Sequence, residues 1–173
     1  RLAFYILNCS EEETNQFIKS IQDAKKNLKY CSKCYNISDT DPCPICSNPK
    51  RDQSSICVVE DVKSVFLFEK LGTYKGYYHV LNGLISPLDG VNPEDIGLDS
   101  LLKRIQEESF QEIILAFKPS VEGETTALYI KKILEGMKIK VSKIASGIPM
   151  GADMEFIDSI TLERALQDRK NLE

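Results

Sequence analysis

Residues 56–72 read ICVVEDVKSVFLFEKLG, a short apolar run followed by an amphipathic segment that ends in glycine. The run at 56–60 has the length of a buried strand, and apolar residues recur through 61–72 at helical spacing. Gly72 is the residue type that most often follows a helix end, because it adopts the left-handed conformation without a steric penalty. A buried strand that leads directly into a helix is the unit from which parallel sheets are built, so this stretch predicts an α/β fold.

The same alternation continues towards the C terminus. Further strands are expected at 77–83, 112–117 and 139–147, helices at 99–109 and 125–137, a long loop at 86–97, and a strand or turn with a terminal helix at 155–170. Amphipathic helices between consecutive strands predict a parallel sheet with short crossovers.

Several single residues have simple structural interpretations. Apolar settings place five of them in the expected core: Cys9, Cys57, Phe66, Phe68 and Ile130. His79 is the only histidine and lies in the strand expected at 77–83. No base or nucleophile accompanies it at a recognisable spacing, so we expect a packed residue rather than a catalyst.

A helix with a clear start precedes this pattern. Ser10 and Glu13 form a capping box, and the apolar residues of one helix face follow it: Phe17, Ile18, Ile21, Ala24 and Leu28. Residues 1–7, RLAFYIL, resemble the second half of another helix and begin without Met, so we expect the chain to be part of a longer protein. Apolar runs stay well short of the ~20 residues of a membrane span, and no signal peptide opens the chain, so we expect a soluble, cytoplasmic protein.

Four of the six cysteines lie within residues 31–46, CSKCYNISDTDPCPIC. Cys31 and Cys34 form one C-x-x-C pair and Cys43 and Cys46 form a second, and two such pairs are a common ligand set for tetrahedral zinc. Two disulfides are the alternative, which a non-secretory setting disfavours. Four protein ligands leave no position for water, so we expect one structural Zn²⁺ ion rather than a catalytic site. Metal binding would supply on the order of 10 kcal/mol of folding free energy to a module too small to build a core.

The net charge of −4 argues against a protein that coats nucleic acid over its whole surface. The charge is uneven, however. A lysine cluster, defined as Lys25, Lys26, Lys29 and Lys33, lies in residues 24–37, which contain no Asp or Glu, and Tyr30 and Tyr35 are interleaved with it. From residue 54 onward, 14 Lys and Arg stand against 19 Asp and Glu, a net charge of −5. The lysine cluster is either a solvated helix end or a local patch for phosphate.

Functional groups of a parallel sheet gather beyond the carboxyl ends of its strands. Glu60 and Asp61 follow the first expected strand, and Glu122 and Glu124 follow the third, so these two acidic loops are expected to face each other. Facing carboxylates can hold Mg²⁺ for phosphoryl chemistry. Glu122 and Glu124 equally fit the first turn of a helix without any ligand, which is the alternative that the spacing favours.

The chain resembles the bacterial recombination mediator family RecR over essentially its whole length. The resemblance is carried by the cysteine stretch and by four further segments: RDQSSICVVEDVKSV, YKGYYHVLNGLISPLDGVNPEDI, VEGETTALYI and GIPMGADMEF. The α/β part resembles a Toprim domain, a parallel sheet flanked by helices that topoisomerases and primases share. The resemblance implies four parts: the helical remnant of a helix-hairpin-helix at 1–30, a four-cysteine zinc finger at 31–53, a Toprim domain at 54–148, and a C-terminal segment for subunit association at 149–173.

Resemblance to RecR also implies a function in recombinational DNA repair. Members of that family are adaptors without enzymatic activity that act with RecO, and often with RecF, to load RecA onto single-stranded DNA. They form homodimers or ring-like homotetramers, bind single-stranded, double-stranded or junction DNA, and work at the nucleoid in the bacterial cytoplasm. The resemblance implies DNA contacts for Arg1 and the lysine cluster, and contacts with RecO for Glu60, Asp61 and Glu122.

One feature separates the chain from catalytic Toprim enzymes. Those enzymes have an Asp-x-Asp after the third strand, which holds metal together with a glutamate of the first strand. Here Lys118 and Ser120 stand at the two aspartate positions, and only Glu60 remains. A lysine ammonium opposes a divalent cation. A metal-dependent Toprim phosphotransferase or nuclease is therefore the disfavoured alternative, and a zinc-ribbon module without DNA contact is a third.

Overall fold

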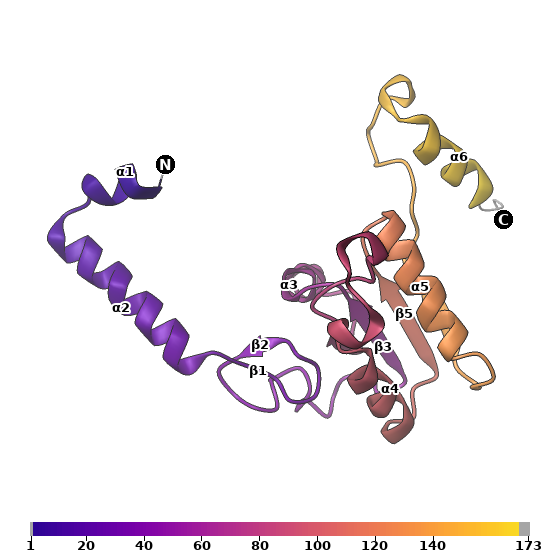
Figure 1. The fold of residues 1–173 in the computed structure, drawn as a ribbon, viewed down its shortest axis with the longest axis horizontal. Coiled ribbons are helices and arrows are strands. Elements are labelled where there is room, and N and C mark those ends of the chain that lie inside the picture. Colours follow the sequence, from indigo (N-terminus) through magenta and orange to yellow (C-terminus); the bar gives the residue numbers. More distant parts are fainter. Residues whose placement is uncertain (1, 170–173) are drawn as a thin grey trace.

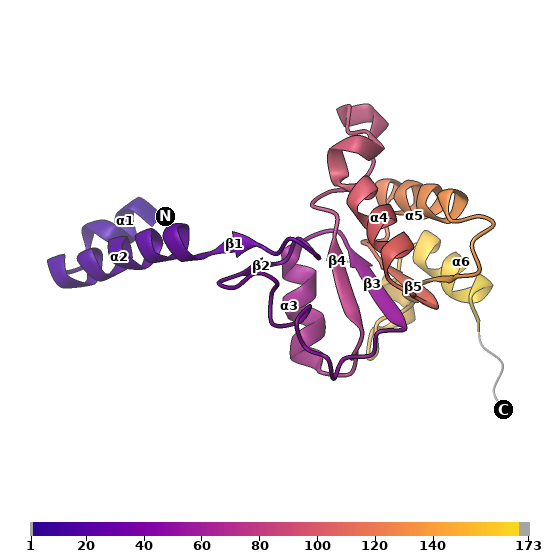
Figure 2. The same cartoon turned by 90° about the horizontal axis from the view of Figure 1, so that it is seen from below.

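The computed structural model describes residues 2–169, which form a parallel sheet domain preceded by two helices and a small cysteine-bearing module (Figure 1). The elements in chain order are α1 (Leu2–Leu7), α2 (Glu11–Asn27), β1 (Lys29–Tyr30), β2 (Ile37–Ser38), β3 (Ser55–Val59), α3 (Val62–Leu71), β4 (Tyr77–Val80), the 3₁₀ turns η1 (Pro87–Asp89) and η2 (Pro93–Ile96), α4 (Leu98–Glu107), β5 (Glu112–Ala116), α5 (Val121–Ile133), β6 (Lys140–Lys143), the 3₁₀ turn η3 (Met154–Phe156) and α6 (Ser159–Gln167). Figures 1 and 2 show α1 and α2 extending away from the sheet, with the β1–β2 hairpin between them and the sheet.

The four longer strands form one parallel sheet in the order β4-β3-β5-β6. β3 is an interior strand, and its Val58 is paired with His79 of β4 and with Leu115 of β5. Every residue of β3 is buried. Both faces of the strand are covered, which explains why its sequence is a continuous apolar run rather than an alternating one. The α/β fold expected from residues 56–72 is therefore confirmed.

Helices cover the two faces of the sheet (Figure 2). On one face, Leu101 of α4 and Ile130 of α5 pack with Ile113 of β5 in the larger core cluster. On the other face, Val65 of α3 packs with Tyr78 of β4 in a smaller cluster. Burial of each large apolar side chain stabilises the fold by roughly 1.5–3 kcal/mol, so the larger cluster supplies most of the driving force.

Two of the predicted helix ends are confirmed. The backbone N–H of Glu13 donates to Ser10 Oγ at 3.2 Å, and the N–H of Ser10 donates to Glu13 Oε2 at 2.8 Å, which completes the capping box of α2. Gly72 ends α3 in the left-handed conformation with a φ of 69°. Both features depend only on residues within one helical turn, so the local sequence is sufficient to predict them.

The start of α5 differs from the prediction. The helix begins at Val121, four residues before the expected start at 125. Ser120 caps it, because the N–H of Gly123 donates to Ser120 Oγ at 3.2 Å. A Cβ at Gly123 would overlap the carbonyl oxygen of Lys118, so glycine permits the tight entry from β5 into the helix. The proline and glycine of this segment resemble loop residues in a linear pattern, which is why the early start was missed.

Burial corrects two of the expectations about single residues. Phe66 lies on the outer face of α3 with 58% of its surface exposed, because Val65 points to the sheet instead. Cys9 lies in the turn between α1 and α2 and is only half-buried, outside the core clusters. Phe68 is half-buried against the smaller cluster. The remaining three are buried as expected: Cys57, His79 and Ile130.

The apolar face expected on α2 is exposed. None of the residues of α2 is buried, and Phe17, Ile18 and Ile21 line a groove of about 630 Å³ between α1 and α2. Within residues 2–169, no helix combines the length and the apolar character that crossing a membrane requires.

Candidate metal centre and adjoining surfaces

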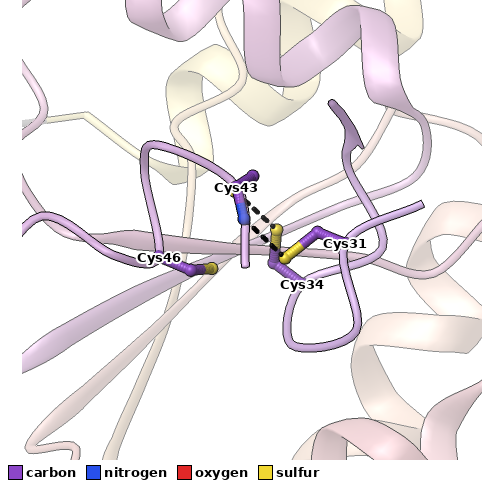
Figure 3. A group of neighbouring side chains, drawn as sticks. All are labelled: Cys31, Cys34, Cys43 and Cys46. Atoms are coloured by element: carbon purple, nitrogen blue, oxygen red, sulfur yellow. Dashed lines mark hydrogen bonds between the residues drawn. The ribbon is translucent and has the colours of Figure 1, made fainter. Parts of the chain in front are cut away.

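The four cysteines of residues 31–46 gather in one place (Figure 3). Cys31 and Cys34 lie in the loop between β1 and β2, which we call the first knuckle, and Cys43 and Cys46 form the second knuckle after β2. All four side chains are buried, and their sulfur atoms lie within 4.8 Å of one another. In the described part of the chain, this is the only group of three or more His, Cys, Asp or Glu side chains placed to share a metal ion.

The spacing of the sulfur atoms fits a tetrahedral zinc ion. Zn–S bonds of about 2.3 Å place neighbouring sulfur atoms about 3.8 Å apart. Cys34 Sγ and Cys43 Sγ are 3.5 Å apart, and all four cysteines are free thiols rather than disulfides. The four side chains are therefore positioned to hold one Zn²⁺ ion, as the two C-x-x-C pairs predict.

Hydrogen bonds from backbone N–H groups to side-chain atoms connect the two knuckles. Asp41 Oδ1 accepts from the backbone N–H of Ser32 at 2.8 Å, which ties the loop before the second knuckle to the first. The backbone N–H of Cys43 donates to Cys31 Sγ at 3.3 Å. These two hydrogen bonds hold the first and second knuckles in place relative to each other.

Close contact between the buried thiols changes their pKa values and favours binding of a cation. Contact with the Cys43 thiol, and then contact with Cys46 and burial, raise the pKa of Cys34 far above its usual range. The Cys34 thiol and the Arg104 guanidinium act to lower the pKa of Cys46, but Cys43 and burial outweigh them and raise it to about 12. Several thiolates in one buried site repel each other, and a divalent ion among them removes that penalty and releases the protons.

The cysteine module packs against the edge strand of the sheet. The backbone N–H of Val80 in β4 donates to the carbonyl of Cys34 at 2.9 Å. The first knuckle thereby covers part of a strand edge that would otherwise present unpaired backbone groups. Ile45 of the second knuckle packs against both core clusters and against the cysteines. The module and the sheet therefore share one apolar interior.

His79 lies at this junction as a packed residue. Its ring is fully buried and forms a T-shaped pair with the ring of Tyr35, at a centroid distance of 5.6 Å, and its Nε2 is 3.4 Å from Ser100 Oγ. Burial, with a smaller effect from the charge of Arg104, lowers the pKa of His79 to about 3. The imidazole is therefore neutral near pH 7, and its role in packing agrees with the sequence-based expectation.

The lysine cluster is spread over three elements. Lys25 and Lys26 lie in the last turn of α2, Lys29 begins β1, and Lys33 lies in the first knuckle. All four are exposed, and Lys33 Nζ is 3.9 Å from Oε1 of Glu108, the residue after α4. Tyr30 is 60% exposed beside them, whereas Tyr35 is half-buried and takes part in packing. Arg1, the remaining expected DNA contact, lies outside the described residues.

Glu60 and Lys118 form an ion pair at the carboxyl end of the sheet. Lys118 Nζ lies 3.0 Å from Glu60 Oε1, and the hydrogen bond with Glu60 raises the pKa of Lys118. The two residues follow β3 and β5, which are neighbours in the sheet. Together with Glu122 they line a hollow of about 540 Å³. The expected convergence of the two acidic loops is therefore seen for Glu60 and Glu122, and a lysine ammonium lies among these carboxylates.

Asp61 and Glu122 also serve as local helix-start residues. Asp61 Oδ1 accepts from the backbone N–H of Ser64 at 2.9 Å and caps α3. Glu122 lies in the first turn of α5, and the side chain of Ser120 lowers the pKa of Glu122. Glu122 and Glu124 both lie in the first turn of α5, as the alternative without a ligand describes, and Asp61 caps α3.

Glu124 points to a different part of the molecule. Its Oε1 lies 2.9 Å from Lys143 Nζ of β6 and 3.3 Å from Arg164 Nη1 of α6. The expectation that Glu124 would face Glu60 is therefore wrong, because helical geometry turns residues two positions apart to different sides.

Two partly or fully buried arginines were not singled out from the sequence. Arg51, in the linker before β3, forms a bidentate ion pair with Glu69 of α3: its Nη1 donates to Oε2 at 2.9 Å and its Nη2 donates to Oε1 at 2.7 Å. Arg104 of α4 is 6% exposed, whereas the adjacent Lys103 is 76% exposed. The one available signal was the helical spacing of Arg104 from the buried Leu101, which places both on the same face.

Three family models match the chain in sequence order. The RecR zinc finger domain, a four-cysteine type, matches residues 28–48, the Toprim domain matches 54–145, and the RecR C-terminal domain matches 147–170. The Toprim match covers more than half of the chain and contains the whole parallel sheet, and the zinc-finger match contains all four clustered cysteines. The chain therefore belongs to the RecR family of recombinational DNA repair proteins.

Proposed function

We propose that the chain is a DNA-binding adaptor of recombinational repair that acts with RecO, and with RecF, to promote RecA loading on single-stranded DNA. It works as a homodimer or ring-like homotetramer at the nucleoid, in the bacterial cytoplasm. The observation that carries the adaptor role is the ion pair between Glu60 and Lys118, 3.0 Å long, at the carboxyl end of the Toprim sheet. That end of the sheet then acts as a binding surface rather than as a metal site.

The charge of Lys118 argues against metal-dependent phosphoryl transfer. Mg²⁺ needs several oxygen ligands in near-octahedral geometry, and here one carboxylate is paired with an ammonium while Asp61 caps a helix. We expect neither cleavage of nicked DNA nor extension of primed DNA when Mg²⁺ is added. Turnover that disappears in the Glu60→Gln protein would replace the adaptor proposal with a nuclease or phosphotransferase.

The lysine cluster supports contact with DNA phosphates. The sequence of residues 24–37 carries these four lysines and no Asp or Glu, in a chain that is acidic from residue 54 onward. The exposed ring of Tyr30 adds a surface on which an unpaired base can stack. Each phosphate contact releases counterions, so the logarithm of affinity falls against the logarithm of salt with a slope of about −0.9 per phosphate on duplex DNA and about −0.7 on single strands.

Binding of fluorescently labelled DNA between about 50 and about 200 mM salt tests this contact. Removing three charges with Lys25→Gln, Lys26→Gln and Lys29→Gln should make the slope shallower by roughly 2–3. The matched control removes three exposed charges from α5 and the segment after it: Lys131→Gln, Lys132→Gln and Lys138→Gln. A wild-type slope near zero would favour a zinc-ribbon interaction module without DNA contact.

We assign the acidic carboxyl end of the sheet, with Glu60, Asp61 and Glu122, to contact with RecO. The net charge of −5 from residue 54 onward suits a basic partner surface. Calorimetric titration of RecO into the Glu60→Gln/Glu122→Gln protein should give weaker binding than wild type, while Glu135→Gln serves as an exposed control. Asp61→Asn is compared only after its thermal stability is measured, because Asp61 caps α3. Unchanged RecO affinity would remove these residues from the interface.

Subunit association is assigned to residues 149–173, after the zinc finger at 31–53 and the Toprim domain at 54–148. Met150, Met154 and Phe156 expose apolar surface, which contact with another subunit would cover. Light scattering should give a lower mass for the Met150→Ser/Phe156→Ser protein than for wild type. Equal masses would move the subunit contact away from this segment.

A further inference from the structure

Arg104 reaches the cysteine module from the sheet domain. Its Nη1 donates to the carbonyl of Tyr78 in β4 at 2.7 Å and lies 3.4 Å from the carbonyl of Lys33 in the first knuckle. Arg104 and Cys46 of the second knuckle line the same hollow, of about 640 Å³, where α4 meets the module. One guanidinium thus bonds to the edge strand and the first knuckle and shares a hollow with the second.

The guanidinium is held in one orientation. Its central carbon lies 5.6 Å from the ring of Tyr77 and 5.7 Å from the ring of Phe110. Glu108 Oε1 accepts from its Nε at 3.2 Å. Aromatic faces and a carboxylate compensate part of the cost of burying the positive charge. A lysine would keep the charge but not the planar fork that makes these contacts together.

A zinc ion bound by four cysteines creates a need for such a charge. Four thiolates around a divalent ion carry a net charge of −2, and the four cysteines are buried. Arg104 is the only buried Lys or Arg among the residues that the structure describes. The lysine of the first knuckle, Lys33, is 51% exposed, so water screens its charge. Groups that orient or neutralise metal ligands change metal affinity by roughly 10- to 100-fold when they are removed.

We propose that Arg104 is a positioning residue of the zinc site, which supplies from the Toprim domain a buried positive charge near both knuckles and a docking contact for the first. The zinc finger then does not fold and bind zinc independently of the Toprim domain. A folded α4 raises the affinity for zinc, and by linkage bound zinc stabilises the contact of α4 with β4. Loss of zinc would therefore destabilise the Toprim sheet, because it would weaken the contacts of Arg104 and the backbone hydrogen bond between Val80 and Cys34.

Zinc affinity in three variants tests the proposal by competition with a chromophoric chelator. Arg104→Met should weaken zinc binding by roughly 10- to 100-fold. Arg104→Lys should recover part of the affinity, because it keeps the charge. Lys103→Met, which removes an exposed charge one residue away on the same helix, should bind zinc like wild type. With Co²⁺ in place of zinc, the absorption bands of tetrahedral sulfur coordination should weaken in Arg104→Met and return in Arg104→Lys.

Hydrogen exchange tests the coupling between the module and the sheet. In wild type, removal of zinc should increase exchange in α4 and β4 as well as in residues 31–46. In Arg104→Met, removal of zinc should leave exchange in α4 unchanged, because the contact that transmits the effect is absent.

Several results would overturn the proposal. The proposal is wrong if wild type and a folded Arg104→Met protein bind zinc with equal affinity. It is also wrong if Lys103→Met loses as much zinc affinity as Arg104→Met. An Arg104→Lys protein as weak as Arg104→Met would contradict the role of the charge. If Arg104→Met does not fold, Arg104→Gln, which keeps an amide donor without the charge, carries the same comparison. A folded wild type that binds no zinc would overturn the metal assignment itself, and this proposal with it.

Discussion

Acidification is expected to destabilise the chain through His79. Burial lowers the pKa of this fully buried residue from 6.5 to about 3. The folded chain keeps the imidazole neutral, while the unfolded chain takes up a proton below about pH 6.5. The unfolded state therefore binds more protons, and stability falls as the pH drops from about 6.5 towards about 3. The linkage relation gives a loss of about 1.4 kcal/mol between about pH 7.5 and about pH 5.5, and a limit of roughly 5 kcal/mol near pH 3.

Urea unfolding at about pH 7.5 and at about pH 5.5, with zinc in excess, measures this loss of stability in wild type and in His79→Gln. The variant retains the cysteines and carboxylates, so the difference between the two pH dependences isolates His79. We expect wild type to lose about 1.4 kcal/mol more than the variant. His79 is the only histidine of the chain, so its imidazole signals in NMR spectra need no assignment. Those signals should not titrate above about pH 5 in the folded protein.

Equal pH dependence in the two proteins would refute the reasoning. An imidazole midpoint near pH 6.5 in the folded chain would refute it as well. Either result would mean that a proton acceptor or water reaches the ring, for example at Nδ1, which has no hydrogen-bond partner among the described residues. The packing of Tyr35 and α4 over the ring would then be looser than the structure indicates.

Four further changes test the fold and the metal centre. Removing zinc with a strong chelator should unfold the two knuckles and abolish hydrogen-exchange protection at Val80, whereas retained protection would contradict the role of the metal in docking. Ile130→Ala should lower the free energy of unfolding by about 2–5 kcal/mol, since Ile130 is buried in the larger cluster. The exposed Phe66→Ala should lower it by less than about 1 kcal/mol, and similar losses for both would contradict the assigned faces. Gly123→Ala should cost about 1–3 kcal/mol in chemical denaturation because its Cβ would overlap the Lys118 carbonyl. A gain in stability, as for an ordinary helical glycine, would show that the turn relaxes easily.

A zinc module that shares its core with the sheet changes what the metal is expected to do. Ile45 packs against both sheet clusters, and the first knuckle is bonded to β4 through Val80. We therefore expect bound zinc to stabilise the edge of the Toprim sheet as well as the knuckles. Helix α2 lies on one side of the β1–β2 hairpin, and the sheet lies on the other (Figure 2). A shared core of this kind agrees with the adaptor role that we propose, in which the chain binds DNA and a protein partner at once.

Features that depend on neighbouring residues were predictable from the sequence. Two C-x-x-C pairs need only a tight turn each to bring their thiols together, and Ser10 and Gly72 act within one turn of their helices. The apolar run at 56–60 predicts a buried strand because its length and composition leave few alternatives. The start of α5 was missed although it is also local, because the cap at Ser120 is followed by a glycine whose close packing against Lys118 is not visible in a linear pattern.

By itself, the sequence determined the zinc ligands, the sequence of strands and helices in the sheet domain, and the absence of an Asp pair after the third strand. Only the tertiary structure decided that Lys118 pairs with Glu60, because that contact exists only where β5 lies beside β3. It also decided that Arg104 rather than Lys103 is buried, at a hollow that Cys46 also lines. Neighbours on a helix point in different directions, and only the packing of α4 against the sheet and the zinc module selects which of the two charges is removed from water.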